Sequence, residues 1–120
     1  MEVKQNYISR TYVSSEGRST FDNINPSNGA VIDTYPNTTH REVQEVCSLA
    51  KDKFYEWRNV SRFTRSEYFF KIAKILEIRK NEVAYAISLE TGKSFNEASA
   101  EVNEALHMAQ YVFGCGKTPY

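Results

Sequence analysis

The sequence predicts an α+β fold in which short β-strands in residues 1–38 are followed by three amphipathic α-helices in residues 39–120. Before Thr39, β-branched and aromatic residues alternate with turn-forming residues, which is typical of short strands. After Thr39, three capping boxes each stand directly ahead of an apolar stripe with helical spacing. The boxes are Thr39-x-x-Glu42, Thr64-x-x-Glu67 and Ser94-x-x-Glu97.

The strand region contains two turn signals. Ser14-Ser15-Glu16-Gly17 interrupts the first apolar residues, and Asn25-Pro26-Ser27-Asn28-Gly29 turns the chain before Ala30-Val31-Ile32. Proline fixes φ in such a turn, and glycine supplies the positive φ that ends it. We expect two or three short strands, which form a sheet too small to be stable without a covering layer.

Each predicted helix has an apolar stripe and a recognisable end. The helices are expected at about residues 39–57, 64–91 and 94–113. Gly92 ends the second helix because glycine readily adopts the left-handed conformation that follows a helix, while Gly114 and Gly116 interrupt the third stripe. The three stripes consist of Val43, Val46, Cys47, Ala50, Phe54 and Trp57; of Phe69, Ile72, Ala73, Leu76, Val83 and Ile87; and of Phe95, Ala98, Val102, Ala105, Ala109 and Val112.

The composition fits one modest core and argues against two classes of partner. The chain has 120 residues, with 15 basic and 15 acidic side chains and a net charge of zero. We therefore expect neither nucleic acid nor an anionic membrane as a partner. No apolar run approaches the ~20 residues of a membrane helix, and the opening residues lack the apolar stretch of a signal peptide. These features predict a cytoplasmic protein.

Two strings resemble the end of a phosphate-binding loop, Gly92-Lys93-Ser94 and Gly116-Lys117-Thr118. The motif also needs a glycine five positions before this one, where the chain has Ile87 and Tyr111. It must also follow a strand, whereas both of these strings follow predicted helix. We interpret both strings as helix ends.

The histidines and cysteines do not form a recognisable metal site or a nucleophile–base pair. His40 and His107 have no partners at metal-ligand spacing. Cys47 lies on an apolar stripe and is expected to be buried as a small hydrophobic residue. Cys115 stands between two glycines, so we expect it to be the more exposed and the more reactive thiol. The residues alone therefore predict no catalytic site.

Several strings, in this order and at these separations, resemble the N-terminal part of the aldehyde dehydrogenase superfamily over essentially the whole chain. They are Asn6-Tyr7-Ile8 with Tyr12-Val13, Phe21-x-x-x-Asn25-Pro26-Ser27-Asn28-Gly29-Ala30-Val31-Ile32, Trp57, and Leu89-Glu90-Thr91-Gly92-Lys93. One position departs from the family. Its first hairpin turn usually carries Asn-Gly, whereas Ser9-Arg10 stands here. A two-residue hairpin turn needs positive φ, which arginine tolerates poorly, so the sequence disfavours that turn geometry.

The resemblance implies that residues 1–120 form a single partial domain, equivalent to outer strands and helices of the family's NAD(P)-binding domain. In the family, the units that bind NAD or NADP and the reacting cysteine, glutamate and asparagine all follow later in the sequence. The resemblance therefore implies no catalytic and no cofactor-binding residue in this chain. Some members hold a monovalent cation at positions matching Asn23, Ile24 and Glu90, and oxygen ligands suit a hard cation. A solvated Glu90 near a helix end is the alternative.

Two main functions compete on this basis. The chain is the N-terminal fragment of an NAD(P)-dependent aldehyde dehydrogenase, which oxidises an aldehyde to a carboxylic acid when complete and is inactive as this piece alone. Alternatively, it is a non-enzymatic helical interaction module that complements a separately encoded dehydrogenase fragment. An unrelated small helical domain is a third interpretation. We expect either self-association or binding to a downstream dehydrogenase fragment, because the third stripe offers more apolar surface than two helices cover.

Overall fold

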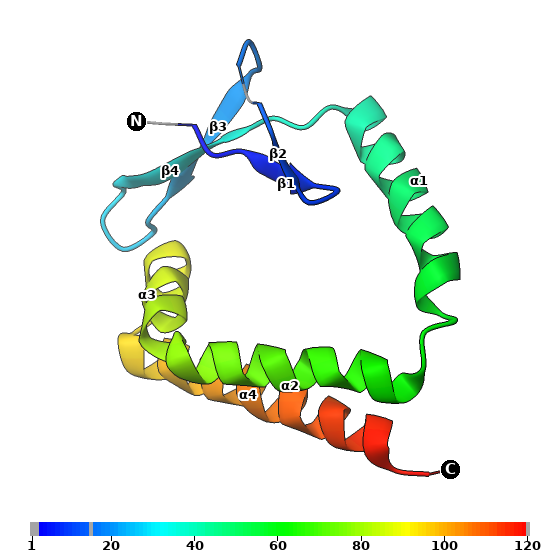
Figure 1. Ribbon diagram of the computed structural model, residues 1–120. Helices are drawn as coiled ribbons and strands as arrows, with labels where there is room; N and C mark the ends of the chain where they lie inside the picture. Colours follow the sequence, from blue (N-terminus) through cyan, green and yellow to red (C-terminus); the bar gives the residue numbers. More distant parts are fainter. Residues whose placement is uncertain (1–2, 15, 120) are drawn as a thin grey trace. The chain divides into compact units, whose positions relative to one another are not determined.

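A computed structural model describes residues 3–14 and 16–119 (Figure 1). The chain divides into two compact units, Met1–Arg58 and Asn59–Tyr120. The first unit contains four short strands and one helix, and the second contains three helices. The expected order of elements, strands followed by amphipathic helices, is confirmed. The described residues form four helices rather than three, because the second predicted helix is divided.

The first hairpin pairs β1 (Asn6–Ile8) with β2 (Thr11–Val13) in antiparallel register. Ser9 and Arg10 form its two-residue turn with φ values of 50° and 67°. Positive φ at both positions is the conformation that we expected Arg10 to disfavour, so this expectation was wrong. The conformation costs roughly 1–2 kcal/mol per residue, and pairing across the strands offsets part of that cost. The rings of Tyr7 and Tyr12 lie on opposite strands with centroids 4.9 Å apart.

The second hairpin pairs β3 (Thr20–Ile24) with β4 (Val31–Pro36), with an irregularity in register between Asn23 and Ile24. Its turn follows the proline–glycine signal in the sequence. The backbone N–H of Gly29 donates to the carbonyl oxygen of Asn25 at 2.8 Å, and Gly29 has a φ of 73°. The buried Asn25 side chain accepts a hydrogen bond from the Ser27 backbone N–H at 2.9 Å. The predicted turn is thus confirmed, and Asn25 organises it from within.

Helix α1 (His40–Trp57) begins at the predicted capping box. The Thr39 side chain accepts from the Glu42 backbone N–H, and the Glu42 side chain bonds in return to the Thr39 backbone. Arg18, in the loop between the hairpins, adds an ion pair to Glu42 at 2.5 Å. No residue of α1 is buried, so its apolar stripe lies at the surface of the first unit.

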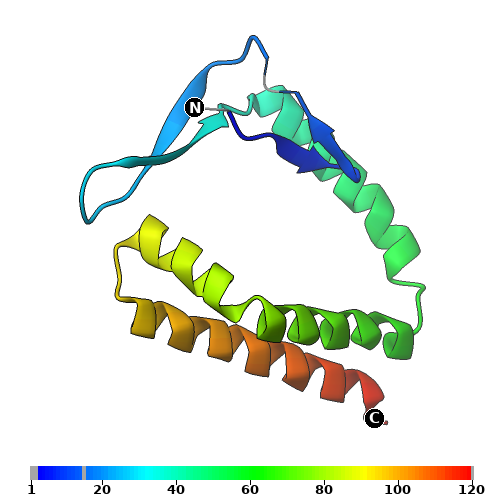
Figure 2. The same ribbon diagram turned by 60° about the vertical axis from the view of Figure 1, so that its left-hand side comes forward.

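The predicted second helix is two helices, α2 (Arg62–Ile78) and α3 (Lys80–Thr91). They meet at Arg79, whose φ of −100° and ψ of 16° depart from helical values. Its backbone N–H still bonds to Ile75, and its carbonyl accepts from Val83, so the residue ends one helix and begins the next. Both helices lie along α4 (Figure 2). The bend keeps both of them in contact with that one long helix.

The second helix also begins earlier than predicted. Its N-cap is Ser61, whose hydroxyl accepts from the Thr64 backbone N–H at 3.1 Å. The capping box expected at Thr64 is therefore wrong. Glu67, its expected partner, pairs instead with Lys117.

Helix α4 (Phe95–Lys117) begins at the predicted box of Ser94 and Glu97. It continues through Gly114 and Gly116, where we expected the helix to have ended. Its small residues form the centre of the second unit, since Ala98 and Val102 are buried together with Ala84 of α3. Leu76, Val83 and Ile87 pack around this cluster. Of the predicted stripe on α4, Phe95 and Ala105 are exposed.

Candidate functional site

A pocket of about 330 Å³ in the second unit is one candidate for a functional site. It lies where the first turns of α2 meet the last turns of α4. Glycine allows this approach, because a Cβ on Gly116 would overlap the Ser66 side chain and lie 3.2 Å from the Arg62 carbonyl oxygen. The pocket is lined by Arg62, Arg65, Ser66, Phe69, Val112, Cys115 and Gly116.

Of the polar groups of this pocket, Arg62 bonds across to the end of α4, whereas Arg65 and Ser66 bond at the start of α2. The Arg62 guanidinium donates to the Thr118 carbonyl oxygen at 2.6 Å, and Arg65 donates to the Val60 carbonyl oxygen at 3.0 Å. The buried Ser66 hydroxyl donates to the Phe63 carbonyl oxygen at 2.8 Å. None of the described lining residues is a histidine or a carboxylate that could act as a general base for the Cys115 thiol. The arrangement is therefore structural and lacks the pair of groups that nucleophilic catalysis needs.

Neither glycine–lysine string forms a phosphate-binding loop. Gly92 has a φ of 74° and donates its N–H to the Ser88 carbonyl oxygen, so it ends α3 as predicted. Ser94 then caps α4. In the second string, Gly116 lies within α4 and Lys117 pairs with Glu67 on α2. Its interpretation as a helix end is thus correct for Lys117 and Thr118, whereas Gly116 serves helix packing, a role that the sequence did not reveal.

The two cysteines have the opposite exposure from the one that we expected. Cys47 is exposed on α1, and Cys115 is half-buried in the pocket. The expectation failed because α1 has no buried residue, and of its apolar stripe Val46 alone is half-buried. For Cys115, the helix continues past both glycines and brings the residue against α2.

Histidines and carboxylates do not gather into a metal site in the part of the chain that the structure describes. His40 begins α1, and its Nε2 lies 3.0 Å from the side-chain nitrogen of Gln44. His107 is exposed on α4. These positions agree with surface roles for both histidines.

The three residues of the expected cation site fall in both units of the chain. Asn23 and Ile24 lie at the register irregularity of β3, and Ile24 is exposed. Glu90 is exposed in the last turn of α3. A cation site would need Asn23 and Ile24 of the first unit and Glu90 of the second unit to come together. The cation site therefore stays a prediction.

The shifted carboxyl groups belong to helix ends. Hydrogen bonds from the backbone and side chain of Thr39 lower the pKa of Glu42, with Arg18 contributing further attraction. Hydrogen bonds from the side chain and backbone of Ser94 lower the pKa of Glu97 in the same way. Hydrogen bonds from the Arg79 side chain, together with its positive charge, lower the pKa of Glu82. These shifts reflect helix capping and one ion pair at the start of α3, as expected for acidic groups near helix N-termini.

The geometry of the described residues does not identify a family, and comparison with known proteins does. The sequence profile described as the aldehyde dehydrogenase family matches residues 12–120. The chain belongs to the aldehyde dehydrogenase family. Malonate-semialdehyde dehydrogenase 2 of Geobacillus kaustophilus is 31% identical over 114 residues, covering 95% of this chain and 24% of that protein. A malonate-semialdehyde dehydrogenase of Listeria innocua is also 31% identical, over 92% of this chain and 22% of its own length.

Solved structures of aldehyde dehydrogenases show the same fold over this region. An NAD-dependent aldehyde dehydrogenase from Sinorhizobium meliloti matches with a TM-score of 0.85 and 28% identity, covering 94% of this chain and 23% of that protein. A betaine aldehyde dehydrogenase from Staphylococcus aureus, in complex with NAD⁺, matches with a TM-score of 0.81 and 28% identity, covering 96% of this chain and 24% of that one.

This aldehyde dehydrogenase chain spans about a quarter of the length of the curated relatives that it matches. The family is one of oxidoreductases, and the predicted resemblance to an N-terminal fragment of it is confirmed. No helix among the described residues is long and apolar enough to cross a membrane.

Proposed function

We propose that the chain is the N-terminal part of an NAD(P)-dependent aldehyde dehydrogenase, in which the complete enzyme oxidises an aldehyde to a carboxylic acid. One observation carries this proposal. The family profile extends over residues 12–120, while the same region makes up only about a quarter of the relatives. The chain thus corresponds to one section of a longer catalytic polypeptide.

We further propose that this section alone has no dehydrogenase activity. Oxidation through a covalent thiohemiacetal needs a nucleophilic thiol, a general base and donors that stabilise the oxyanion. Cys47 is exposed on a helix, and the pocket around Cys115 has no carboxylate or histidine among its described lining residues. NAD or NADP would therefore be bound and used by the remaining part of the enzyme.

The partner in this proposal is the remaining part of a dehydrogenase polypeptide, whether joined to the chain or encoded separately. Support comes from the many large apolar side chains that the described residues leave exposed. The alternative is a helical module that only binds such a fragment and has no part in catalysis. A separately supplied fragment that gains activity on binding favours the enzyme section over the binding module.

Replacing the matching quarter of a relative tests the proposal. We would fuse this chain to the part of Geobacillus kaustophilus malonate-semialdehyde dehydrogenase 2 that lies outside its match. NADH formation is then measured with malonate semialdehyde for the fusion, for this chain alone and for the partner portion alone. Activity in the fusion only is the expected result.

Two controls make the outcome clear. This chain alone could turn over the aldehyde even when both Cys47→Ser and Cys115→Ser are introduced. Such activity would mean that other groups of this chain perform the chemistry, which contradicts the proposal that this section alone is inactive. Turnover by this chain alone that one of these substitutions abolishes would assign catalysis to that thiol. A fusion that folds but never forms NADH would contradict the proposed role of the chain in the enzyme.

A further inference from the structure

A pocket of about 450 Å³ in the first unit is lined from both hairpins, and we call it the hairpin pocket. Residues 3–5 link the two hairpins, since Val3 pairs in parallel with Thr34 of β4 before the chain enters β1. The backbone N–H of Lys4 donates to the Thr34 carbonyl oxygen at 2.8 Å. The volume lies within the range of small-molecule sites. The lining residues are Val3, Lys4, Gln5, Tyr12 and Tyr35.

Two tyrosine rings supply the aromatic surface of the hairpin pocket. Tyr12 lies on β2 and is 68% exposed, and its ring contacts Tyr7 on the paired strand. Tyr35 lies on β4 and is half-buried, and its ring stacks on Phe21 of β3 with centroids 6.0 Å apart. Each pocket ring is therefore held by a cross-strand partner, and a planar ligand ring can stack against it.

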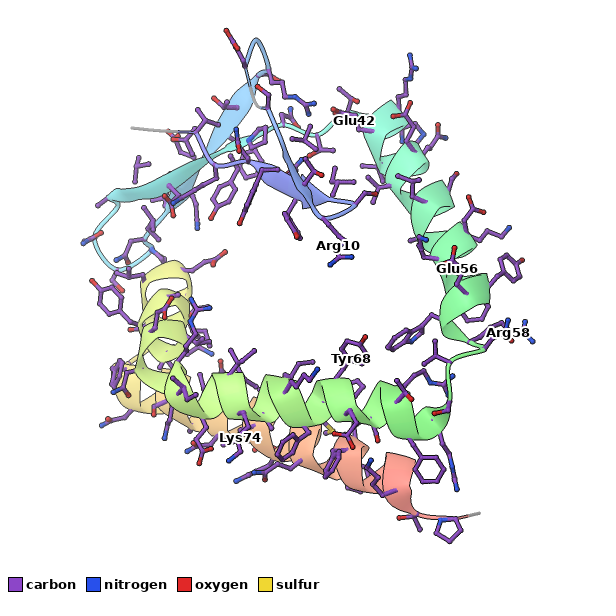
Figure 3. The ribbon with its side chains drawn as sticks, viewed as in Figure 1. Arg10, Glu42, Glu56, Arg58, Tyr68 and Lys74 are labelled. Carbon is purple, nitrogen blue, oxygen red and sulfur yellow. The ribbon has the colours of Figure 1, made fainter. Side chains whose placement is uncertain are left out.

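The polar groups of the hairpin pocket suit an uncharged ligand. Among its described lining residues, Lys4 is the one charged side chain, and its Nζ lies 3.2 Å from a carboxylate oxygen of Asp33. This ion pair offsets the ammonium charge. Figure 3 shows the Arg10 side chain projecting from the turn of the first hairpin, away from β3 and β4, and Arg10 does not line the pocket.

The Gln5 side chain adds hydrogen-bonding capacity to the two rings. It is exposed, and its amide offers two N–H donors and a carbonyl acceptor. A flat ring that carries donors and acceptors along its edge can therefore use the tyrosine rings and this amide together. Nucleobases are rings of this kind, and they stack on aromatic side chains.

We propose that the hairpin pocket binds the base of a small nucleoside. The base stacks on Tyr12 and Tyr35, and its edge bonds to the Gln5 amide. This binding site goes beyond the proposed dehydrogenase function, and its test does not depend on that function.

Titration of this chain with adenosine, followed by NMR of the backbone amides, tests the proposal. D-Ribose and AMP are the comparison ligands, because ribose lacks the base and AMP adds a negatively charged phosphate. We expect saturable adenosine binding with the largest shifts at residues 3–5, 12 and 35, and no ribose binding. The AMP Kd should lie within about threefold of the adenosine Kd, since the Lys4 charge is offset.

Several results of this titration overturn the proposal. Adenosine that does not bind, or that shifts other residues instead, removes the site. Ribose binding equal to that of adenosine shows that the base is not recognised. AMP binding that is about tenfold tighter or more shows that the pocket selects a phosphate.

A matched pair of tyrosine variants separates ligand contact from hairpin stability. Tyr7→Leu and Tyr12→Leu both remove the ring contact across the first hairpin, whereas only Tyr12 lines the hairpin pocket. We expect Tyr12→Leu to raise the adenosine Kd about tenfold, because the base loses a stacking surface. Tyr7→Leu should change it by less than about twofold. Equal weakening by both variants, or no weakening by Tyr12→Leu, overturns the proposal.

Gln5→Met decides the question if the tyrosine variants lose the first hairpin, which their free NMR spectra reveal. This substitution keeps the length of the side chain and removes the amide. We expect it to raise the adenosine Kd about fivefold, because the base loses hydrogen bonds at its edge. Unchanged adenosine binding by Gln5→Met overturns the proposed recognition of the base.

Discussion

Gly114 and Gly116 stand two residues apart in α4, yet their surroundings differ completely. A Cβ on Gly114 would meet nothing within 4 Å, whereas a Cβ on Gly116 would overlap the Ser66 side chain. Both look like helix breakers in the sequence, because glycine inside a helix is costly. The distinction depends on a residue 50 positions away on α2, which no local pattern reveals.

This difference predicts opposite effects for the same substitution. Gly116→Ala should lower the free energy of unfolding by about 1–3 kcal/mol, since overpacking pushes α2 and α4 apart. Gly114→Ala should raise it by about 0.5–1 kcal/mol, because alanine loses less conformational entropy in a helix. Urea denaturation of both variants measures the two effects. A shift in the same direction for both would contradict the packing role of Gly116.

At the scale of whole elements, Ser61 and Thr64 are the two candidate N-cap residues of α2. Ser61 accepts a hydrogen bond from the Thr64 backbone N–H, whereas the sequence pattern favours Thr64 itself as the cap. Ser61→Ala should therefore destabilise the chain by about 1 kcal/mol, the usual cost of losing an N-cap. Thr64→Ala should cost only a few tenths of a kcal/mol, since it removes an exposed hydroxyl. Thermal melts followed by circular dichroism distinguish them, and a larger loss for Thr64→Ala would restore the original capping box.

The predicted elements succeeded where a local signal was complete. The boxes at Thr39 and Ser94 each supply both halves of a reciprocal hydrogen-bond pair, and Gly92 supplies the conformation that ends a helix. The box at Thr64 failed because Ser61 caps the helix three residues earlier, which places Thr64 within the first turn. The break at Arg79 also escaped prediction, since it serves the packing of two helices on α4. The first case was decided by a competing local cap, and the second involves contacts with α4 that the local pattern does not contain.

For the molecule as a whole, some features of the candidate sites could be predicted from the sequence, and others depend on packing between helices. The residue types predict no catalytic pair, and among the described residues the pocket around Cys115 is lined by no histidine or carboxylate. The relative exposure of the two cysteines was not predictable, because it depends on which apolar stripe finds a partner. The stripe on α4 packs against α2 and α3, whereas no residue of the stripe on α1 is buried.

The two units should consequently differ in how well they protect their backbone amides. Hydrogen exchange proceeds through local opening, which costs least where few apolar side chains are buried. Ala98 and Val102 lie in a buried cluster, while α1 has no buried residue. We therefore expect amides near Val102 to exchange far more slowly than those in the middle of α1, measured by NMR on the isolated chain. Equal protection would mean that the stripe on α1 is covered in solution, and dilution would then show whether a second copy covers it.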